Sequence, residues 1–103
     1  MPKTDVFRAV ADPTRRAILD RLRHRRRSVN EIAHHFPVSR PAISKHLRIL
    51  RRARLVVEQR EGRNRIYGLN PLPLGRVDLW LDQYRSSLRR SLRRLKAYVE
   101  SQE

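Results

Sequence analysis

The 103-residue sequence contains no cysteine. This absence excludes disulfide bonds, thiolate metal ligands and a cysteine nucleophile. Glycine is also scarce, at three residues, and no glycine-rich phosphate-binding loop is present. The nearest approach to an acid pair, Asp78 and Asp82, lies in one predicted helix with basic neighbours. We therefore expect no enzymatic activity and no cofactor.

Long apolar runs are missing as well. The first five residues contain no apolar run, so no signal peptide is expected, and no stretch approaches the roughly 20 apolar residues of a membrane span. We expect a cytoplasmic protein with no membrane partner. Hydrophobic residues make up 39% of the chain, which suffices for one small domain. This share is low for a monomer, so a second copy that extends the core would help.

Acidic residues are few, 10 against 25 lysines and arginines, which gives a formal net charge of +15. A field of this sign favours a polyanion, either a nucleic acid or an acidic membrane surface. Arginine richness can also reflect the coding bias of an organism. Charge therefore suggests the class of partner without deciding it.

The most informative stretch runs from Ser39 to Arg52. Ile43, Leu47 and Leu50 recur at helical spacing and form one apolar stripe. The residues that fall largely on the other side are Arg40, Pro41, Ser44, Lys45, Arg48 and Arg52. Ser39 suits the N-cap position, and a first-turn proline loses no intrahelical hydrogen bond. The pattern is typical of a helix that enters the DNA major groove, although a plain solvated amphipathic helix has the same periodicity.

The preceding residues predict three further helices, each with a recognisable start. Thr4 is the predicted cap of the first helix, and Asp12 with Pro13 opens the second, which ends in the basic run 23–27. Ser28 and Glu31 have the spacing of a capping box for the third. The residues expected to face inward in the second and third helices are Ala17, Ile18, Leu19, Leu22, Ile32, Ala33 and Phe36. Two short helices joined by a tight turn predict a helix-turn-helix over 28–53.

A β-hairpin is predicted over 55–69, with its turn at 61–64. Arg60, Arg63 and Arg65 cluster at its tip. A basic hairpin that follows a reading helix favours a wing able to contact phosphates or a minor groove. The alternative is an ordinary surface hairpin with solvated charges.

The last predicted helix covers 76–101, after a proline-containing linker over 70–75. It carries a near-heptad apolar seam, formed by Leu81, Tyr84, Leu88, Leu92, Leu95 and Val99. The seam is too long for one small core, so we expect it to pair with a second copy, helped by Val6, Phe7 and Val10. A basic amphipathic helix can also lie on a membrane, but the rest of the chain already accounts for a basic surface.

The order of elements and three segments, 6–19, 39–47 and 61–71, resemble the ArsR-type winged helix-turn-helix repressors. The resemblance implies a dimer built from the terminal helices that binds an operator and blocks transcription. The best-known members sense metals through a cysteine pair in the third helix or through histidines in the last one. This sequence has neither, and its four histidines are His24, His34, His35 and His46. We therefore expect a member without a metal site.

These observations predict a mainly α-helical winged helix-turn-helix with a small β-hairpin, one domain over 1–103, and a homodimer on an inverted-repeat operator. The residues expected to contact DNA are Ser39, Arg40, Pro41, Ser44, Lys45, His46, Arg48, Arg60, Arg63 and Arg65. His46 is expected to pack at the core boundary or to touch a phosphate. The alternative function is a nonspecific, nucleoid-type nucleic-acid-binding protein.

Overall fold

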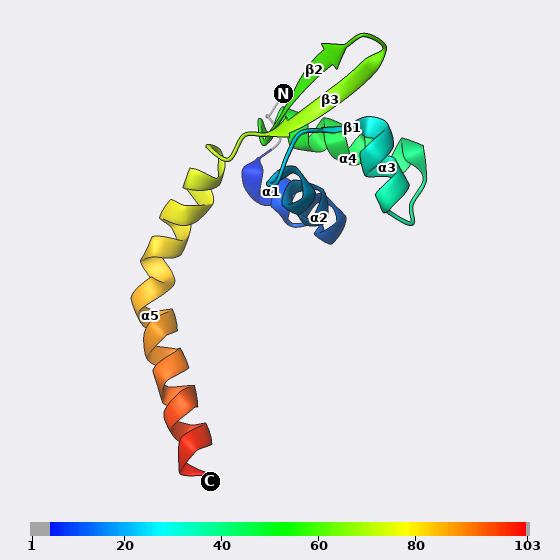
Figure 1. Ribbon diagram of the computed structural model, residues 1–103. Coiled ribbons are helices and arrows are strands. Elements are labelled where there is room, and N and C mark those ends of the chain that lie inside the picture. The colour runs from blue at the N-terminus through cyan, green and yellow to red at the C-terminus, as the bar shows by residue number, and fades with distance from the viewer. Residues whose placement is uncertain (1–4, 103) are drawn as a thin grey trace.

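The computed structural model describes residues 5–102. In chain order the elements are α1 (Val6–Val10), α2 (Pro13–Leu22), β1 (Arg27–Ser28), α3 (Val29–His35), α4 (Arg40–Arg52), β2 (Val56–Glu61), β3 (Asn64–Leu69) and α5 (Leu74–Ser101). Figure 1 shows a body formed by the first seven elements, from which α5 projects as a long single helix. The mainly helical fold with a small sheet is as the sequence predicts.

The predicted helix starts of α2, α3 and α4 are confirmed. The Asp12 carboxylate accepts from the Arg15 amide at 2.9 Å, and this hydrogen bond is the main cause that lowers the pKa of Asp12. Ser28 and Glu31 form a complete capping box. The Ser39 hydroxyl accepts from the Ala42 amide at 3.2 Å. These short polar side chains satisfy amides that have no intrahelical acceptor, so they set where each helix begins.

Helix α1 differs from the expectation at its start. Asp5 is the N-cap, and its carboxylate accepts from the Phe7 amide at 3.0 Å. Thr4, the cap that the sequence suggested, lies outside the described residues. An aspartate one residue closer to the helix serves the same purpose, and sequence spacing alone does not separate the two.

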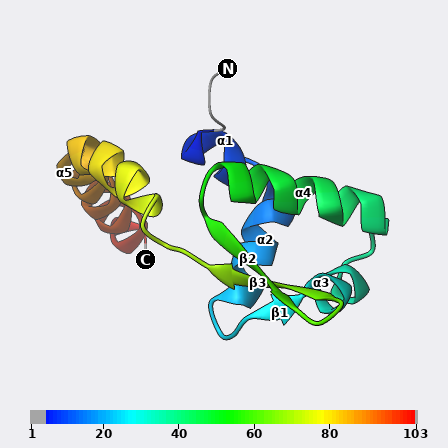
Figure 2. The ribbon, with the colours of Figure 1, turned by 90° about the horizontal axis from the view of Figure 1, so that it is seen from above.

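The sheet is three-stranded and antiparallel, in the order β1-β3-β2 (Figure 2). The predicted hairpin is confirmed, with Gly62 at a φ of 64° in its tight turn. Strand β1 was not predicted, since residues 23–27 were interpreted as the basic end of the second helix. Helix α2 instead ends at Leu22, and Arg27 and Ser28 pair with Tyr67 and Ile66 of β3.

The hydrophobic core lies where α1, α2, α3, α4 and the hairpin meet. Its buried side chains are Val6, Ala9, Ile18, Leu19, Leu22, Ile32, Ile43, Leu47, Leu50, Ala53, Leu55, Val56 and Tyr67. Val6, which we expected at a dimer interface, is 3% exposed and belongs to this core. Phe7 and Val10 keep some exposed surface.

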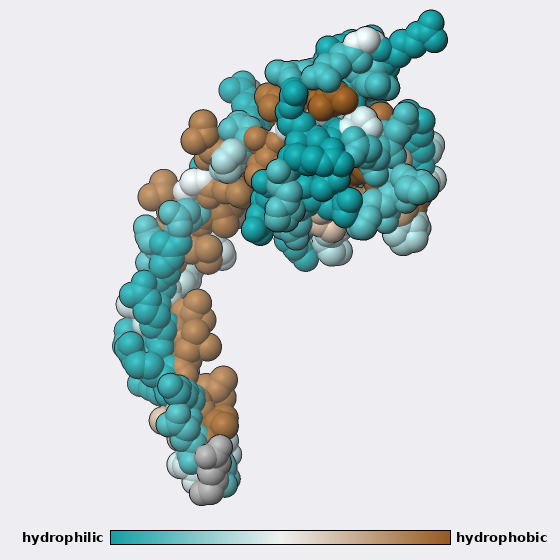
Figure 3. Space-filling model, in the orientation of Figure 1, coloured by the Kyte–Doolittle hydropathy of each residue, from teal (hydrophilic) through white to brown (hydrophobic). Residues whose placement is uncertain are grey.

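Helix α5 contributes no buried residue to the core. It begins at Leu74, two residues before the predicted start, and only Leu74 and Val77 pack against the buried cluster. At its base the Phe7 ring meets Trp80 edge-on, with ring centroids 5.8 Å apart. Beyond this contact the predicted seam is exposed, and Figure 3 shows it as a brown stripe along the helix. Across residues 5–102 no helix is both long enough and apolar enough to span a bilayer.

Candidate nucleic-acid interface

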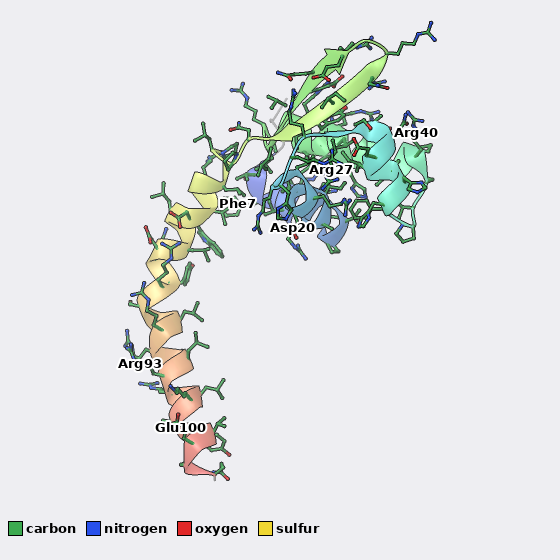
Figure 4. All side chains as sticks on the ribbon, in the orientation of Figure 1. Phe7, Asp20, Arg27, Arg40, Arg93 and Glu100 are labelled. Atoms are coloured by element: carbon green, nitrogen blue, oxygen red, sulfur yellow. The ribbon has the colours of Figure 1, made fainter. Side chains whose placement is uncertain are left out.

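Helix α4 separates its two faces sharply. Ile43, Leu47 and Leu50 are at most 1% exposed and anchor the helix to the core. The side chains of Arg40, Lys45 and Arg48 lie in solvent, and Figure 4 labels Arg40 at the end of the body farthest from α5. Because the buried stripe fixes the rotation of the helix, the polar face has a defined direction.

A cleft of about 270 Å³ separates α4 from the hairpin. Five of the residues predicted to bind DNA line it: Arg40, Ser44, Arg48, Arg63 and Arg65. Four others are exposed but lie outside it: Ser39, Pro41, Lys45 and Arg60. The structure therefore brings the reading helix and the wing together around a single arginine-lined space.

Seven residues that line the cleft were not predicted to bind DNA: Ser28, Val29, Asn30, Arg51, Glu58, Asn64 and Tyr67. Arg51 follows Arg48 by three positions, so helical spacing could have placed it on the same face. Glu58 forms an ion pair with Arg51, and it accepts a hydrogen bond of 3.3 Å from the Tyr67 hydroxyl. Burial, followed by the nearby Glu58 charge, raises the pKa of Tyr67. No local signal predicts this contact, because it joins α4, β2 and β3.

The wing concentrates positive charge without neutralising it. Arg60 lies directly opposite Arg65 in the β2–β3 ladder, with Arg63 in the turn between the strands. Like charges at such a cross-strand pair repel each other. Within residues 5–102, none of these three arginines forms a salt bridge with a carboxylate. The hairpin tip therefore offers an anionic partner guanidinium groups that no carboxylate of residues 5–102 pairs with.

His46 lies on the inner side of α4, with its side chain 20% exposed. Its Nδ1 is 3.2 Å from Nη1 of Arg15 and 3.9 Å from a carboxylate oxygen of Asp12. Arg15 also donates to the carbonyl oxygens of Ala9 and Arg8, at 2.8 and 3.1 Å. Of the two roles predicted for His46, this position matches packing at the core boundary.

Two of the other histidines are adjacent in the sequence, and His24 is ten residues before them. His34 and His35 sit near the end of α3, where Nε2 of His35 is 2.9 Å from Nη1 of Arg21. In the described part of the chain, no three histidine, aspartate or glutamate side chains gather as metal ligands would. Asp78 and Asp82 both pair with Arg85, and the Asp78 contact is the main cause that raises the pKa of Arg85.

Comparison with known proteins gives a consistent assignment. The sequence profile described as "Bacterial regulatory protein, arsR family" matches residues 12–57, from the cap of α2 to β2. The chain is 46% identical over 78 residues to HTH-type transcriptional regulator Rv2034 of Mycobacterium tuberculosis, covering 76% of this chain and 73% of that protein. It is 42% identical over 77 residues to the transcriptional repressor SdpR of Bacillus subtilis, covering 75% and 86%.

A solved structure supports the same conclusion over nearly the whole chain. The ArsR-like transcriptional regulator from Rhodococcus sp. RHA1 superposes with a TM-score of 0.72 and 35% identity, covering 95% of this chain and 90% of that one. The arrangement of helices and strands described above is therefore similar to that of a solved ArsR-like regulator. The chain belongs to the ArsR family of bacterial DNA-binding transcriptional regulators.

Proposed function

We propose that this DNA-binding transcriptional regulator is a homodimeric repressor that reads an inverted-repeat operator with α4. One observation carries the proposal. The stripe of Ile43, Leu47 and Leu50 is buried, so Arg40, Ser44 and Arg48 are held on the neighbouring face of the helix, which borders the cleft. A rigid helix with an arginine-bearing outer face has the shape and chemistry of a major-groove reader.

Base readout is assigned to Arg40, Ser44, Lys45 and Arg48, with Pro41 close to the groove floor. An arginine can form two hydrogen bonds with the edge of guanine, and such a contact discriminates by roughly 1–3 kcal/mol. The Ser39 hydroxyl caps the helix by accepting from the Ala42 amide, and the exposed positive end of the helix dipole attracts a phosphate.

The wing is assigned a different task. Arg60 and Arg65 lie in the two strands of the hairpin and Arg63 lies in its turn, so none of them is on a helix that fits a groove. We assign them phosphate contacts or insertion into a minor groove, which raise affinity for every sequence.

A two-fold dimer places two reading helices in successive major grooves. The operator is then an inverted repeat with half-sites about 10 base pairs apart, or a multiple of that spacing. In this proposal the whole chain 1–103 is one domain, 28–53 reads the groove, 55–69 is the wing and 76–101 holds the dimer. The exposed seam of α5, with Phe7 and Val10 at its base, supplies the dimer contact.

We also propose that operator binding needs no metal. The support is chemical: α3 carries no cysteine and α5 carries no histidine. A regulator whose partner is the chromosome works in the cytoplasm.

A second candidate function is nonspecific nucleic-acid binding. The net charge of +15 favours it, because arginines also crowd α5, away from the cleft. Strong nonspecific affinity and operator reading can coexist, and the ratio of the two affinities decides which one matters.

The test selects bound duplexes from a random pool with the native protein and with Arg40→Ala. The native protein should enrich one motif, and Arg40→Ala should relax preference at one symmetric pair of positions. Arg90→Ala, which removes the same charge from α5, should leave the motif unchanged. Identical base preferences for native protein and Arg40→Ala would show that Arg40 reads no base.

A further inference from the structure

The arginine-lined cleft between α4 and the hairpin also holds a carboxylate, that of Glu58. It is the only acidic side chain among the described residues that line the cleft. A carboxylate repels phosphates, so it works against the binding of DNA to this surface. The Glu58 side chain is 15% exposed, whereas that of Glu61 in the same strand is 57% exposed. A carboxylate so far removed from solvent needs partners for its charge.

Two side chains from different elements act as these partners. Arg51 of α4 forms an ion pair with Glu58, and the Tyr67 hydroxyl of β3 donates to the same carboxylate oxygen at 3.3 Å. Between residues 5 and 102, no other side-chain hydrogen bond or ion pair joins α4 to either strand of the hairpin. The Arg51–Glu58 pair is therefore the polar link between the reading helix and the wing.

Glu58 is also the last residue of β2 that is largely shielded from solvent. Val56, two positions earlier, is buried in the core at 2% exposure, and residues 59–61 are exposed. Successive side chains of a strand point to opposite faces, so Glu61 lies on the other face, where it pairs with Arg26. Glu58 thus holds the wing against α4 at the point where the exposed, arginine-bearing tip begins.

The pair also determines which arginines of the cleft are available to DNA. Five arginines line the cleft, and within the described part of the chain only Arg51 forms a salt bridge with a carboxylate. An ion pair has no net charge, so Arg51 attracts a phosphate far less than the other four arginines do. Arg51 is therefore placed to hold the wing and not to contact the DNA backbone.

We propose that Arg51 and Glu58 are positioning residues that determine how strongly this regulator prefers its operator to other DNA. Their ion pair holds the wing at one distance from α4, so that both elements meet the duplex together. Base reading requires both to fit one register, whereas phosphate contacts form in any register. A link formed in advance favours the operator selectively, because less freedom is lost on binding. The inference rests on the base-reading role proposed for α4.

The main test removes the pair as a unit, because the double variant Arg51→Ala/Glu58→Ala keeps the net charge of the cleft. Affinity is measured at several salt concentrations for a random duplex and for the duplex that the native protein enriches from a random pool. We expect the double variant to bind the enriched duplex about tenfold more weakly, because the wing is no longer held in place. Binding to the random duplex and the salt slope should match those of the native protein within error.

Two further comparisons separate position from charge. Glu58→Gln and Glu58→Ala remove the same charge, but glutamine still offers an acceptor to Arg51 and Tyr67. Glu58→Gln should therefore keep most of the operator preference that Glu58→Ala loses. Lys96→Ala/Glu100→Ala removes an ion pair at the end of α5 far from the cleft and should change neither affinity (Figure 4). Circular dichroism at the temperature of the binding measurement checks that each variant is folded.

Three results would contradict the proposal. Equal weakening on both duplexes, with a salt slope lower by about one unit per subunit, would show that Arg51 contacts a phosphate directly. An unchanged operator preference in the folded double variant would show that the wing needs no link to α4. In both cases the reading role of α4 stands. A native protein that enriches no sequence would overturn that role, and this inference with it.

Discussion

Helices α4 and α5 both set an apolar stripe against a face rich in arginine, yet the two stripes have different surroundings. Ile43, Leu47 and Leu50 of α4 are covered by the core of their own chain. Leu88, Leu92 and Leu95 of α5 are 54–58% exposed. Amphipathic periodicity indicates that an apolar stripe is buried in the functional protein, but it does not indicate whether the same chain or another molecule buries it. In α4 the cover is intramolecular, and in α5 we assign it to a second copy.

The polar faces differ in the same way. On α4 the arginines line a cleft shared with the wing, so their charge converges on one space. On α5 the pairs Arg85–Arg89 and Arg89–Arg93 stand four residues apart and repel by roughly 0.2–0.5 kcal/mol each. Their charge is spread along a rod. The arginines of α4 are thus arranged as expected for a helix that reads DNA. Those of α5 are arranged as expected for a helix that a protein partner or a polyanion stabilises.

The difference between the two stripes is tested by truncating one leucine of each and comparing the free energies of unfolding. Both variants are made in a Leu88→Asp background, where the chain is expected to be monomeric. Leu47→Ala leaves a cavity in the core and should lower the free energy of unfolding by about 2–5 kcal/mol. Leu92→Ala, the matched control, removes the same atoms from an exposed site and should change it by less than about 0.5 kcal/mol. Denaturant titration followed by circular dichroism measures both.

Leu88→Asp on its own should abolish the dimer. It places a carboxylate of each subunit in the apolar seam that the proposed dimer buries, and we expect the dimer dissociation constant to rise about a hundredfold or more. Operator affinity should fall as well, because the two half-sites are no longer read by linked helices. A Leu88→Asp protein that stays dimeric and keeps its operator affinity would contradict this role for α5. Replacement of Leu88 by Met, of similar volume, should leave the dimer intact.

Arg63→Ala should have a smaller and uniform effect. Loss of one phosphate contact per subunit should weaken binding to all duplexes alike and lower the salt slope by about one unit per subunit. Affinity measured against salt concentration, on the operator and on a random duplex, separates this from base reading. A loss confined to one operator position would show that the wing reads sequence.

Removal or addition of metal should have no measurable effect. Operator affinity in the presence of a chelator, and again with added zinc, should match that of the untreated protein within error. A reproducible tenfold shift at low metal concentration would reveal a site that the histidines and carboxylates of the chain do not suggest.

Local chemistry explains which parts of the fold were predictable. Asp12, Ser28 and Ser39 each satisfy amides within three residues, so a helix start is encoded in a few neighbouring side chains. The wing follows from two β-prone segments around Gly62. Strand β1 could not be predicted, because two residues at the end of a basic run are too few to show an alternating pattern. Their partners in β3 are also about forty residues away in the sequence.

The candidate site divides in the same way. The outer face of α4 could be predicted because Arg40, Ser44 and Arg48 follow helical spacing. The contact of Glu58 with Arg51 could not, because it depends on how the hairpin folds back over α4. Glu58 and Tyr67 are direct partners in the hairpin itself. Val6 was placed at a dimer interface because a short apolar helix does not show which of its residues face inward.

Sedimentation equilibrium of the native protein at micromolar concentration tests the central contrast most directly. If the stripe of α5 is covered by a second copy, the measured mass should be twice that of one chain, and Leu88→Asp should return it to that of one chain. A native protein that sediments as a single chain at that concentration would contradict the account.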